Sequence, residues 1–459
     1  MKIGVVGMGA AGLRTMMLLR EAGHEVQGFE ARDRVGGRLK TIRTETGFYE
    51  AGGEWIDADH HRLLALLKEL GQEPVPDSQY PGAVFMAGKR YTEDEYEEHA
   101  EALEKVEEEA DKLALDLDEV PWHNSLYANL DGQTLGDWLD AQAGKASIPR
   151  RILESVYRSD EGDDTHEIGL LGWLCGRLAA LDRTGGEMSS MRFPDGAQGF
   201  CEAMVERAGP IMFGAALQQV TFENNQIGLF FGKEEVRWFD QVVLALPAGC
   251  LRDIAFEPGI SEAKQEAFEA ARMSRTIKIA MHFDEKFWEG SPRTLTDSAL
   301  QQVWAAQLSP LPSLGGAGGG LNTEADPHAI NPPPTPPNLG RGVSLLAYLG
   351  GERAIELALM GEEEAGKALL EELEQIHPGA KAHYKGATLH DWVHDDFSHG
   401  GFFSLPPGYV LDHYGALVRS ENGLHFAGDF GGSWIGTIEG ALESAERVAE
   451  EIKRAANVH

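Results

Sequence analysis

The feature that most constrains this chain is a glycine-rich turn near its start. Lys2 to Gly7 (KIGVVG) predicts a short buried strand, the run GMGAAG occupies residues 7–12, and apolar residues at helical spacing follow. Strand, turn and helix in this order predict the start of a βαβ unit that binds a dinucleotide. Gly7 permits the tight turn, Gly9 lets a pyrophosphate approach the backbone, and Gly12 allows the helix to pack closely.

A second predicted strand delivers an acid at the distance that this unit requires. The strand covers residues 25–29, and Glu30 follows it, 18 residues after Gly12. Glu30 is placed to accept hydrogen bonds from an adenosine ribose, and the first helical residues, Ala10 and Ala11, offer N–H groups to the phosphates. With 55 glycines in 459 residues, such a glycine pattern occurs about once by chance, so the surrounding elements carry the prediction.

A second glycine turn follows in the segment ARDRVGGR, residues 31–38. Gly36 and Gly37 let the chain fold over a phosphate, and Arg38 can grip it through two parallel hydrogen bonds. We assign Ala31 and Arg32 to the same site. The alternative, an exposed basic turn, is disfavoured by the dinucleotide pattern that precedes it.

With these motifs the chain resembles the flavin-containing amine oxidase family, which includes monoamine oxidases, polyamine oxidases and L-amino-acid oxidases. The resemblance implies bound FAD, oxidation of an amine C–N bond to an imine, and reduction of O₂ to H₂O₂. The segments that carry it follow the family's order: VVGMGAAG, FEARDRVGGR, YEAGGEWID (49–57), RFPDGAQGF (192–200), VVLALP (242–247), RTIKIAMHFDEKFW (275–288) and FAGDFGGSWIGTIEGALESAERVAEEI (426–452).

The motif order predicts an α/β protein with two discontinuous domains. One is a Rossmann-like FAD-binding domain of the two-dinucleotide-binding flavoprotein type, and the other is an α+β substrate domain. Apolar runs at 217–222 and 227–231 around Asn224-Asn225 predict a hairpin within the first. The predicted boundaries are 1–75, 190–285 and 390–459 for the FAD-binding domain, 76–189 and 286–389 for the substrate domain, and 309–342 for a flexible Gly- and Pro-rich insertion.

Charge and cysteine content limit the partners. The net charge of −34 argues against nucleic acid and anionic membrane surfaces. Residues 92–119 alone carry fourteen acids against two lysines and predict an amphipathic helix with an acidic outer face. Three scattered cysteines form no disulfide framework, and no apolar run is long enough to span a bilayer. We expect a cytoplasmic enzyme whose partners are a small amine and O₂, and a homodimer stays open.

Lys278 is the most informative catalytic candidate. It lies in an otherwise apolar predicted strand, where a lysine is costly unless its ammonium reaches water or a partner. From the residues alone, the wet face of a half-buried strand explains it equally well. The resemblance implies that Lys278 holds a water against the flavin N5 edge and assists reoxidation by O₂.

The C-terminal motif supplies the next group of cofactor residues. Gly428 and Asp429 end a predicted strand, and Asp429 is placed to hydrogen-bond a flavin ribityl chain. The long helix after Gly436, which begins at Thr437 and Ile438, can stabilise negative charge on the reduced flavin through its N-terminus.

Two further segments complete the predicted cofactor site. The resemblance implies that Gly52, Gly53 and Trp55 bring backbone close to the isoalloxazine ring, and that Val220 contacts the cofactor. Glu54 is assigned with them, although a glutamate more often lies at the surface.

Departures from the family pattern bear on specificity. Monoamine oxidases cage the substrate nitrogen between two tyrosines, whereas the matching positions here hold Phe402 and Thr437. Trp434 could fill the gap, and a packing role for it is equally consistent. No metal site is expected, because His390 and His394 belong to no metal-binding motif.

The residues that follow Gly52 and Gly53 bear on the substrate class. L-amino-acid oxidases carry an arginine there for the substrate carboxylate, whereas this chain has Glu54 and then Asp57. Asp57 falls where certain polyamine oxidases carry an acid, and the alternative is that it caps the helix expected at 60–70. We therefore expect an amine without a carboxylate. An L-amino-acid oxidase or related FAD-dependent desaturase, and a non-catalytic flavin-binding partner protein, stay open.

The segment that carries the cofactor-binding cysteine of monoamine oxidases predicts the mode of FAD attachment. The matching residues, 392–403, contain no cysteine, so we expect non-covalent FAD. Acid precipitation of the purified protein should therefore leave all of the yellow flavin in the supernatant. Flavin absorbance that stays on the washed precipitate would contradict this prediction.

Overall fold

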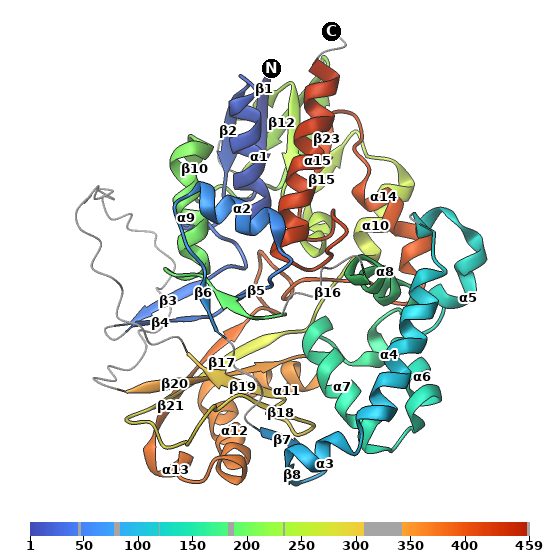
Figure 1. Cartoon of the computed structure of the whole chain (residues 1–459). Coiled ribbons are helices and arrows are strands. Elements are labelled where there is room, and N and C mark those ends of the chain that lie inside the picture. The colour runs from blue at the N-terminus through green and yellow to red at the C-terminus, as the bar shows by residue number, and fades with distance from the viewer. Residues whose placement is uncertain are drawn as a thin grey trace.

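Two lobes make up the molecule (Figure 1). The structure is a computed structural model that describes residues 1–44, 47–77, 83–118, 120–181, 188–232, 235–306 and 342–456. The five-stranded lobe is named for its five-stranded sheet and holds the N-terminal strand and the long C-terminal helix. The seven-stranded lobe holds a larger, seven-stranded sheet with helices packed against it. A separate group of helices lies beside both lobes.

The five-stranded sheet is parallel throughout, with the strand order β10-β2-β1-β14-β23. Helix α1 packs between α15 and α9 on one side of it. Because the carboxyl ends of parallel strands meet at one edge, the loops after β1, β2, β14 and β23 converge there. The bounds are β1 Lys2–Val6, β2 Glu25–Phe29, β10 Ile211–Met212, β14 Gln241–Leu244, β23 Leu424–Phe426, α1 Ala10–Glu21, α9 Ala197–Ala208 and α15 Ile438–Ala456.

A four-stranded sheet, β13-β12-β11-β15, contains the predicted hairpin. Its turn residues Asn224 and Asn225 have φ values of 52° and 62°, the left-handed conformation that a two-residue hairpin turn requires. The hairpin prediction is therefore confirmed. The bounds are β11 Gln219–Glu223, β12 Gln226–Phe230, β13 Arg237–Phe239 and β15 Ala255–Glu257.

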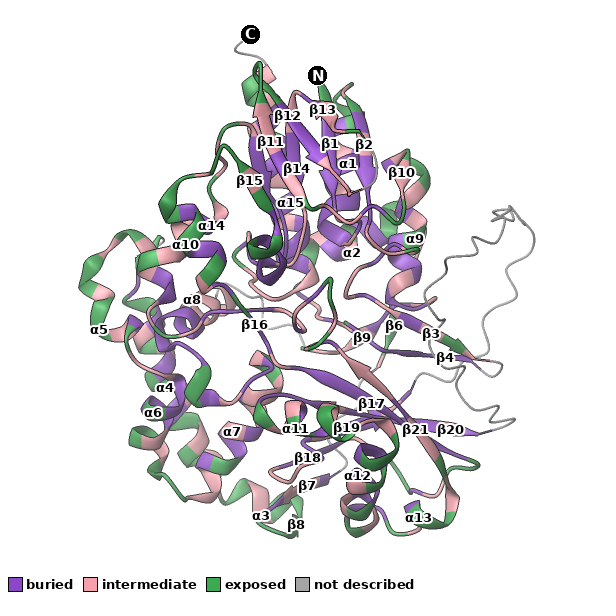
Figure 2. Ribbon diagram, turned by 180° about the vertical axis from the view of Figure 1, so that it is seen from behind, coloured by how far each residue is buried: buried purple, intermediate pink, exposed green. Residues whose placement is uncertain are grey.

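The seven-stranded sheet has the order β21-β17-β20-β19-β18-β7-β8, with β17 (Ile277–Phe283) buried along its whole length (Figure 2). Alternate residues of β17 point to opposite faces. Ile277, Ile279, Met281 and Phe283 belong to the core that includes helices α11 and α12. Lys278 therefore faces the other lobe. The bounds are β7 Ala83–Met86, β8 Lys89–Tyr91, β18 Thr294–Thr296, β19 Gln302–Ala305, β20 Val343–Leu349, β21 Tyr384–Asp391, α11 Glu352–Met360, α12 Glu362–Ile376 and α13 Ala380–His383.

The described part of the acidic segment 92–119 contains two helices rather than one continuous helix. A capping box at Thr92 begins α3, and α4 buries Val106, Ala110 and Ala114 against α8. The remaining helices are α2 His61–Glu69, α3 Glu93–Glu97, α4 Ala100–Leu115, α5 Ala128–Asp131, α6 Leu135–Leu139, α7 Ile148–Glu161, α8 Leu170–Leu181, α10 Glu262–Ala270 and α14 Gly415–Val418. The remaining strands are β3 Thr41–Thr44, β4 Gly47–Glu50, β5 Trp55–Ile56, β6 Val75–Pro76, β9 Met191–Arg192, β16 Arg272–Met273 and β22 Phe403–Ser404.

The predicted domain boundaries stay a prediction, with one difference at residue 285. That boundary assigns β17 to the FAD-binding domain, yet β17 pairs with β20 and β21 in the seven-stranded sheet. The sequence of a buried strand does not reveal its partners, which explains the difference. The predicted insertion at 309–342 lies, apart from its last residue, outside the described residues.

Within the described ranges, no helix is both long enough and apolar enough to cross a bilayer. All three cysteines are described and free. The described side chains contain no cluster of metal-ligating type, and His390 and His394 pair instead with Tyr49 and Asp391.

His282 gives the fold a pH dependence that can be measured. It is fully buried on β17, and its two ring nitrogens lie 2.9 Å from Ser344 Oγ and 2.9 Å from Thr388 Oγ1. Burial lowers the pKa of His282 to about 4. The folded state therefore holds the neutral ring, and its stability contribution is complete above about pH 6.5 and is lost as the pH falls toward 4.

Between pH 7.5 and 4, the unfolding free energy of His282→Gln should fall by about 3 kcal/mol less than that of the wild type. The reason is that glutamine can bridge both hydroxyls without titrating. Urea unfolding at intervals between pH 7.5 and 4 measures the difference. The exposed His61 supplies the control His61→Gln, which should follow the wild type. An unchanged acid limb in His282→Gln would show that this histidine does not stay neutral.

Candidate active site

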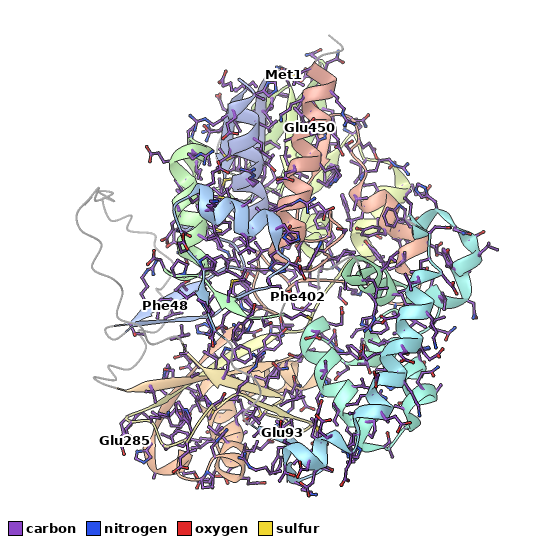
Figure 3. All side chains as sticks on the ribbon, viewed as in Figure 1. Met1, Phe48, Glu93, Glu285, Phe402 and Glu450 are labelled. Atoms are coloured by element: carbon purple, nitrogen blue, oxygen red, sulfur yellow. The ribbon has the colours of Figure 1, made fainter. Side chains whose placement is uncertain are left out.

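A cavity of about 550 Å³ lies where the two lobes meet. Its wall includes the loops after β1, β2, β14 and β23, and also Lys278 of β17. Phe402 lies near the middle of the molecule between the lobes (Figure 3). The carboxyl edge of the parallel sheet therefore opens onto the face of the seven-stranded sheet that carries Lys278.

The three glycines of the first turn differ in what surrounds them. A Cβ on Gly7, which has a φ of 94°, would lie 2.3 Å from Ala245 O, and one on Gly12 would lie 1.9 Å from Gly7 O. A Cβ on Gly9 would meet nothing closer than Gly36 O at 3.9 Å. Gly7 and Gly12 are thus required by the fold, and Gly12 is not part of the cavity wall. Gly9 leaves open space on the wall, beside Ala10 and Ala11.

Glu30 lies buried at the end of β2. Its carboxylate accepts hydrogen bonds from Met8 N at 2.8 Å and Arg32 N at 2.9 Å, and burial raises its pKa. The Arg32 guanidinium donates to Asp395 and to Ser398 Oγ. Glu30, Ala31 and Arg32 all line the cavity.

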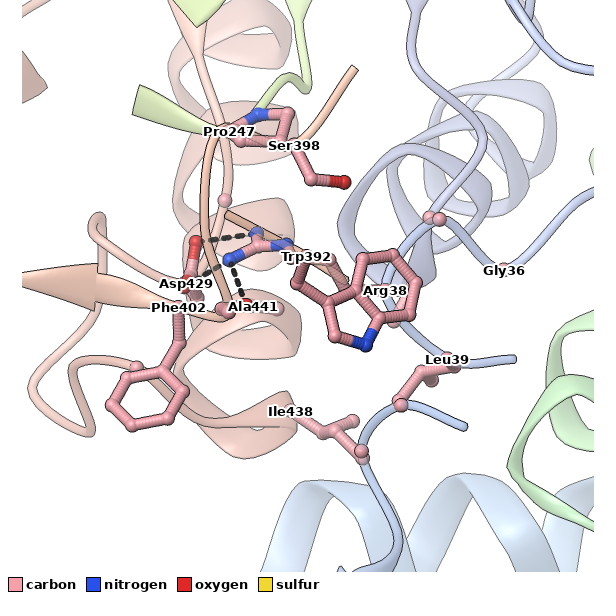
Figure 4. A pocket seen from close by; sticks show the side chains of 18 of the residues that line it. Gly36, Arg38, Leu39, Pro247, Trp392, Ser398, Phe402, Asp429, Ile438 and Ala441 are labelled. Atoms are coloured by element: carbon pink, nitrogen blue, oxygen red, sulfur yellow. Dashed lines mark hydrogen bonds and ion pairs between the residues drawn. The ribbon is translucent and has the colours of Figure 1, made fainter. Parts of the chain in front are cut away.

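Arg38 makes a different contact from the one that we predicted. Its guanidinium donates to both oxygens of Asp429, at 2.7 and 2.8 Å, and to Gly401 O at 3.1 Å (Figure 4). The planar fork that suits a phosphate suits a carboxylate equally well. Arg34, which the sequence analysis passed over, donates to Gly37 O at 2.7 Å and so supports the second glycine turn.

The segment 51–53 is held from the opposite lobe. A Cβ on Gly52 would lie 1.8 Å from Arg38 O, so only glycine fits there. Trp392 Nε1 donates to Ala51 O at 2.7 Å, and Lys278 Nζ donates to Gly52 O at 2.7 Å. Gly52, Gly53 and Trp55 line the cavity.

Lys278 is buried, which excludes the wet strand face as its explanation. Besides Gly52 O, its Nζ donates to Glu54 Oε2 at 2.7 Å and to Glu50 O at 3.3 Å. An ammonium has three N–H donors, and the protein supplies an acceptor for each.

Glu54 is not a surface acid. Trp304 Nε1 donates to both of its oxygens at 3.1 Å, and Arg192 donates to Oε1. Although burial alone would raise the pKa of Glu54, Lys278 and Arg192 outweigh it and lower that pKa. The nearby Glu50 lacks such partners, and burial raises its pKa to about 7. The motif RFPDGAQGF contains Arg192 but gave no indication of this contact.

The predicted partial cage is arranged differently. Thr437 Oγ1 donates to Trp434 O at 2.8 Å and accepts from Gly440 N at 3.1 Å, so the hydroxyl caps α15. Trp434 is not part of the cavity wall, and its ring packs edge-on against His60 with centroids 5.2 Å apart. Phe402 and Thr437 both line the cavity.

Other aromatic side chains occupy the wall instead. Trp304 lies 5.8 Å from Trp55 and 6.0 Å from Tyr348, centroid to centroid. All three line the cavity, as do Arg293 and Asp160. Sequence analysis missed Trp304 and Tyr348 because they come from strands whose pairing was not predicted.

Asp57 lies on the wall and is not the helix cap that the alternative proposed. Ser189 N donates to its Oδ1 at 2.7 Å, whereas α2 begins at His61 with His60 as its N-cap. The capping hypothesis is therefore wrong.

Of the remaining predicted residues, Gly428, Asp429, Gly436 and Ile438 line the cavity. Val220 does not, because its side chain is fully buried in β11, and Leu217 three residues earlier occupies the wall. Leu217 precedes β11, and the sequence did not show where this strand begins, so it could not distinguish the two positions.

Known proteins with the same architecture span almost the whole chain. The family model described as flavin containing amine oxidoreductase matches residues 10–453. Flavin-containing amine oxidase A of Canis lupus familiaris is 23% identical over 475 residues, which cover 98% of this chain and 84% of the relative. Flavin-containing amine oxidase B of Homo sapiens is 24% identical over 485 residues, covering 98% and 86%.

Two solved structures have the same fold. Cyclohexylamine oxidase from Brevibacterium oxydans IH-35A superposes with a TM-score of 0.82 at 22% identity, covering 99% of both chains. Wild-type putrescine oxidase bound to putrescine gives a TM-score of 0.82 at 22% identity with the same coverage. Because the family model spans nearly all of the chain, this protein belongs to the flavin-containing amine oxidoreductase family and is an FAD-dependent enzyme that oxidises amines.

Proposed function

We propose that this enzyme oxidises a small amine that carries no α-carboxylate and passes the electrons to O₂, forming H₂O₂. The observation that carries the proposal is that a single cavity extends from the space beside Gly9 to Lys278 and to the aromatic side chains of Phe402 and Tyr348. A dinucleotide cofactor and a small substrate can therefore meet inside one cavity.

The residues on the wall fit FAD. Helix α1 has no side-chain cap at Gly9, so its first N–H groups are available to a diphosphate, and the space beside Gly9 admits one. The buried carboxylate of Glu30 suits ribose hydroxyls. FAD, when bound, supplies the chemistry that accepts a hydride equivalent from the amine carbon.

We assign the flavin end to the opposite part of the wall. The residues that would hold the ring and its ribityl chain are Gly52, Gly53, Trp392, Gly428, Asp429, Gly436, Thr437 and Ile438. The N-terminus of α15 supplies positive dipole there.

Non-covalent attachment accords with the chemistry of the wall. Cys250 is a cysteine on it, beside Arg38 and Asp253, and burial raises the pKa of its thiol to about 12. A thiol that stays protonated is a poor nucleophile.

Substrate binding would fall to aromatic and acidic side chains. Phe402, Trp304 and Tyr348 offer faces to an alkyl or aryl amine, and Asp57 offers a carboxylate to a second cationic group. No described wall residue is placed as a strong base for the amine, so a neutral amine is the expected reacting form.

One observation favours a second candidate, an amino-acid oxidase. Arg293 lines the cavity with its guanidinium 5.0 Å from the Trp55 ring centroid. An arginine on the wall could bind a substrate carboxylate, although it comes from the seven-stranded lobe and not from the position after the glycine pair.

Anaerobic mixing with matched substrates separates the two candidates. We expect amines to bleach the flavin absorbance faster than the α-amino acids that carry the same side chain. The Asp57→Asn variant should lose about 10- to 150-fold in kcat/KM for diamines and little for monoamines, because one charge-assisted contact contributes about 1.5–3 kcal/mol. Glu101→Gln, an equal charge change on an exposed side chain, is the control. Faster bleaching by amino acids would favour the second candidate.

The open space at Gly9 predicts a variant that folds but does not hold the cofactor. Gly9 has φ −78° and ψ −173°, which other residues adopt, so Gly9→Val should fold and fill the space that the diphosphate needs. We expect at least about tenfold weaker FAD binding with little change in the melting temperature of the apoprotein. Gly176→Val, where a Cβ would meet nothing within 4 Å and which is not on the wall, should retain FAD. Equal FAD affinity in both variants would contradict the proposed site.

A further inference from the structure

Glu54 lies at the centre of the site, where the sequence placed it among the cofactor residues, yet its carboxylate is held by Lys278, Arg192 and Trp304. It directly follows the glycine pair of the segment 51–53, on the cavity wall, and its side chain is only 1% exposed. A buried carboxylate costs free energy unless cations and hydrogen bonds surround it. Its surroundings therefore indicate what it does.

Each carboxylate oxygen of Glu54 and each N–H group of Lys278 already has a hydrogen-bond partner in the protein. Each carboxylate oxygen of Glu54 accepts from Trp304 and from one cation, Arg192 at Oε1 and Lys278 at Oε2. Each N–H of Lys278 has an acceptor, in Glu54, Gly52 O and Glu50 O. The lysine consequently has no N–H group to spare and a full negative charge beside it.

We propose that Glu54 is a positioning residue that keeps Lys278 protonated and fixed on the carbonyls of residues 50 and 52, so that Lys278 acts as a fixed positive charge and not as a proton acceptor. The proposal rests on the proposed function, which puts the flavin beside Lys278. According to this proposal, the role of Lys278 depends on Glu54, the acid that directly follows Gly52 and Gly53.

Other charges around the pair do not replace Glu54. Arg192 forms an ion pair with Asp77 as well as with Glu54. The positive charge of Arg192 is therefore offset by the negative charge of Asp77. Glu50 and His390 also face Lys278. The pKa of Glu50 is raised to about 7, so this acid is only partly ionised near pH 7. The pKa of His390 is lowered to about 3, so its ring is neutral at that pH. Glu54 is thus the fully ionised acid in hydrogen-bond contact with Lys278.

The effect of removing Glu54 has a definite sign. An adjacent anion favours the protonated lysine, so Glu54→Gln should make Lys278 lose its proton more readily. The loss of an opposite charge at this distance moves a titration by about 1 to 3 pH units, here toward lower pH.

The test follows the visible absorption of the FAD-bound enzyme between pH 7 and 10, before any substrate is added. We expect Glu54→Gln to show one transition that is absent from both the wild type and the double variant Glu54→Gln/Lys278→Met. In turnover with an amine, the alkaline limb of kcat should shift to lower pH by about 1 to 3 units in Glu54→Gln, and Glu54→Asp should restore it in part. The double variant also keeps the buried charge balanced, so it separates charge from packing.

Each outcome decides the proposal. A spectrum and pH profile of Glu54→Gln that match the wild type would overturn it. If Glu54→Gln fails to fold, restoration of folding in the double variant supports the charge coupling, and continued misfolding assigns Glu54 to packing alone. A wild type without flavin, or one that no amine bleaches, would instead refute the proposed function.

Discussion

The site depends on a row of alternating charges that crosses from one lobe to the other. Lys278 comes from the seven-stranded sheet, Glu54 from the glycine turn, Arg192 from β9 and Asp77 from the segment after β6. Buried charges of this kind are stabilising only as a complete set, because the loss of any one leaves an uncompensated ion in a low-dielectric interior. The row therefore fixes the glycine turn against β17 and sets the distance between the lobes at the cavity.

Glycine makes this approach of backbone segments feasible, and its three uses are distinct. Gly12 and Gly52 allow one chain segment to lie against another, as the short distances to Gly7 O and Arg38 O demonstrate. Gly7 supplies a positive φ at the turn itself. Among these four glycines, Gly9 is the one with space beside it on the cavity wall, which is the property expected where a ligand approaches the backbone.

The local elements were more predictable from the sequence than their partners were. The βαβ start and the Asn224-Asn225 hairpin follow from residues adjacent in the chain, so pattern and turn chemistry suffice to predict them. The position of Lys278 was predicted as a site through resemblance, but its contact with Glu54 joins residues 224 positions apart. Trp304 and Tyr348 were missed for the same reason, since strand pairing determines which alternate residues share a face.

The charge of the cavity wall indicates how it can hold an anionic cofactor. The wall has seven acids (Glu30, Glu54, Asp57, Asp160, Asp253, Asp396 and Asp429) against four bases (Arg32, Arg38, Lys278 and Arg293), among the residues described. Arg38 and Arg32 are moreover paired with Asp429 and Asp395. The net charge of the wall therefore does not attract a diphosphate, and the backbone N–H groups at the N-terminus of α1 are the groups that would bind it. The same acidic wall would attract protonated amines, although the neutral form is the one expected to react.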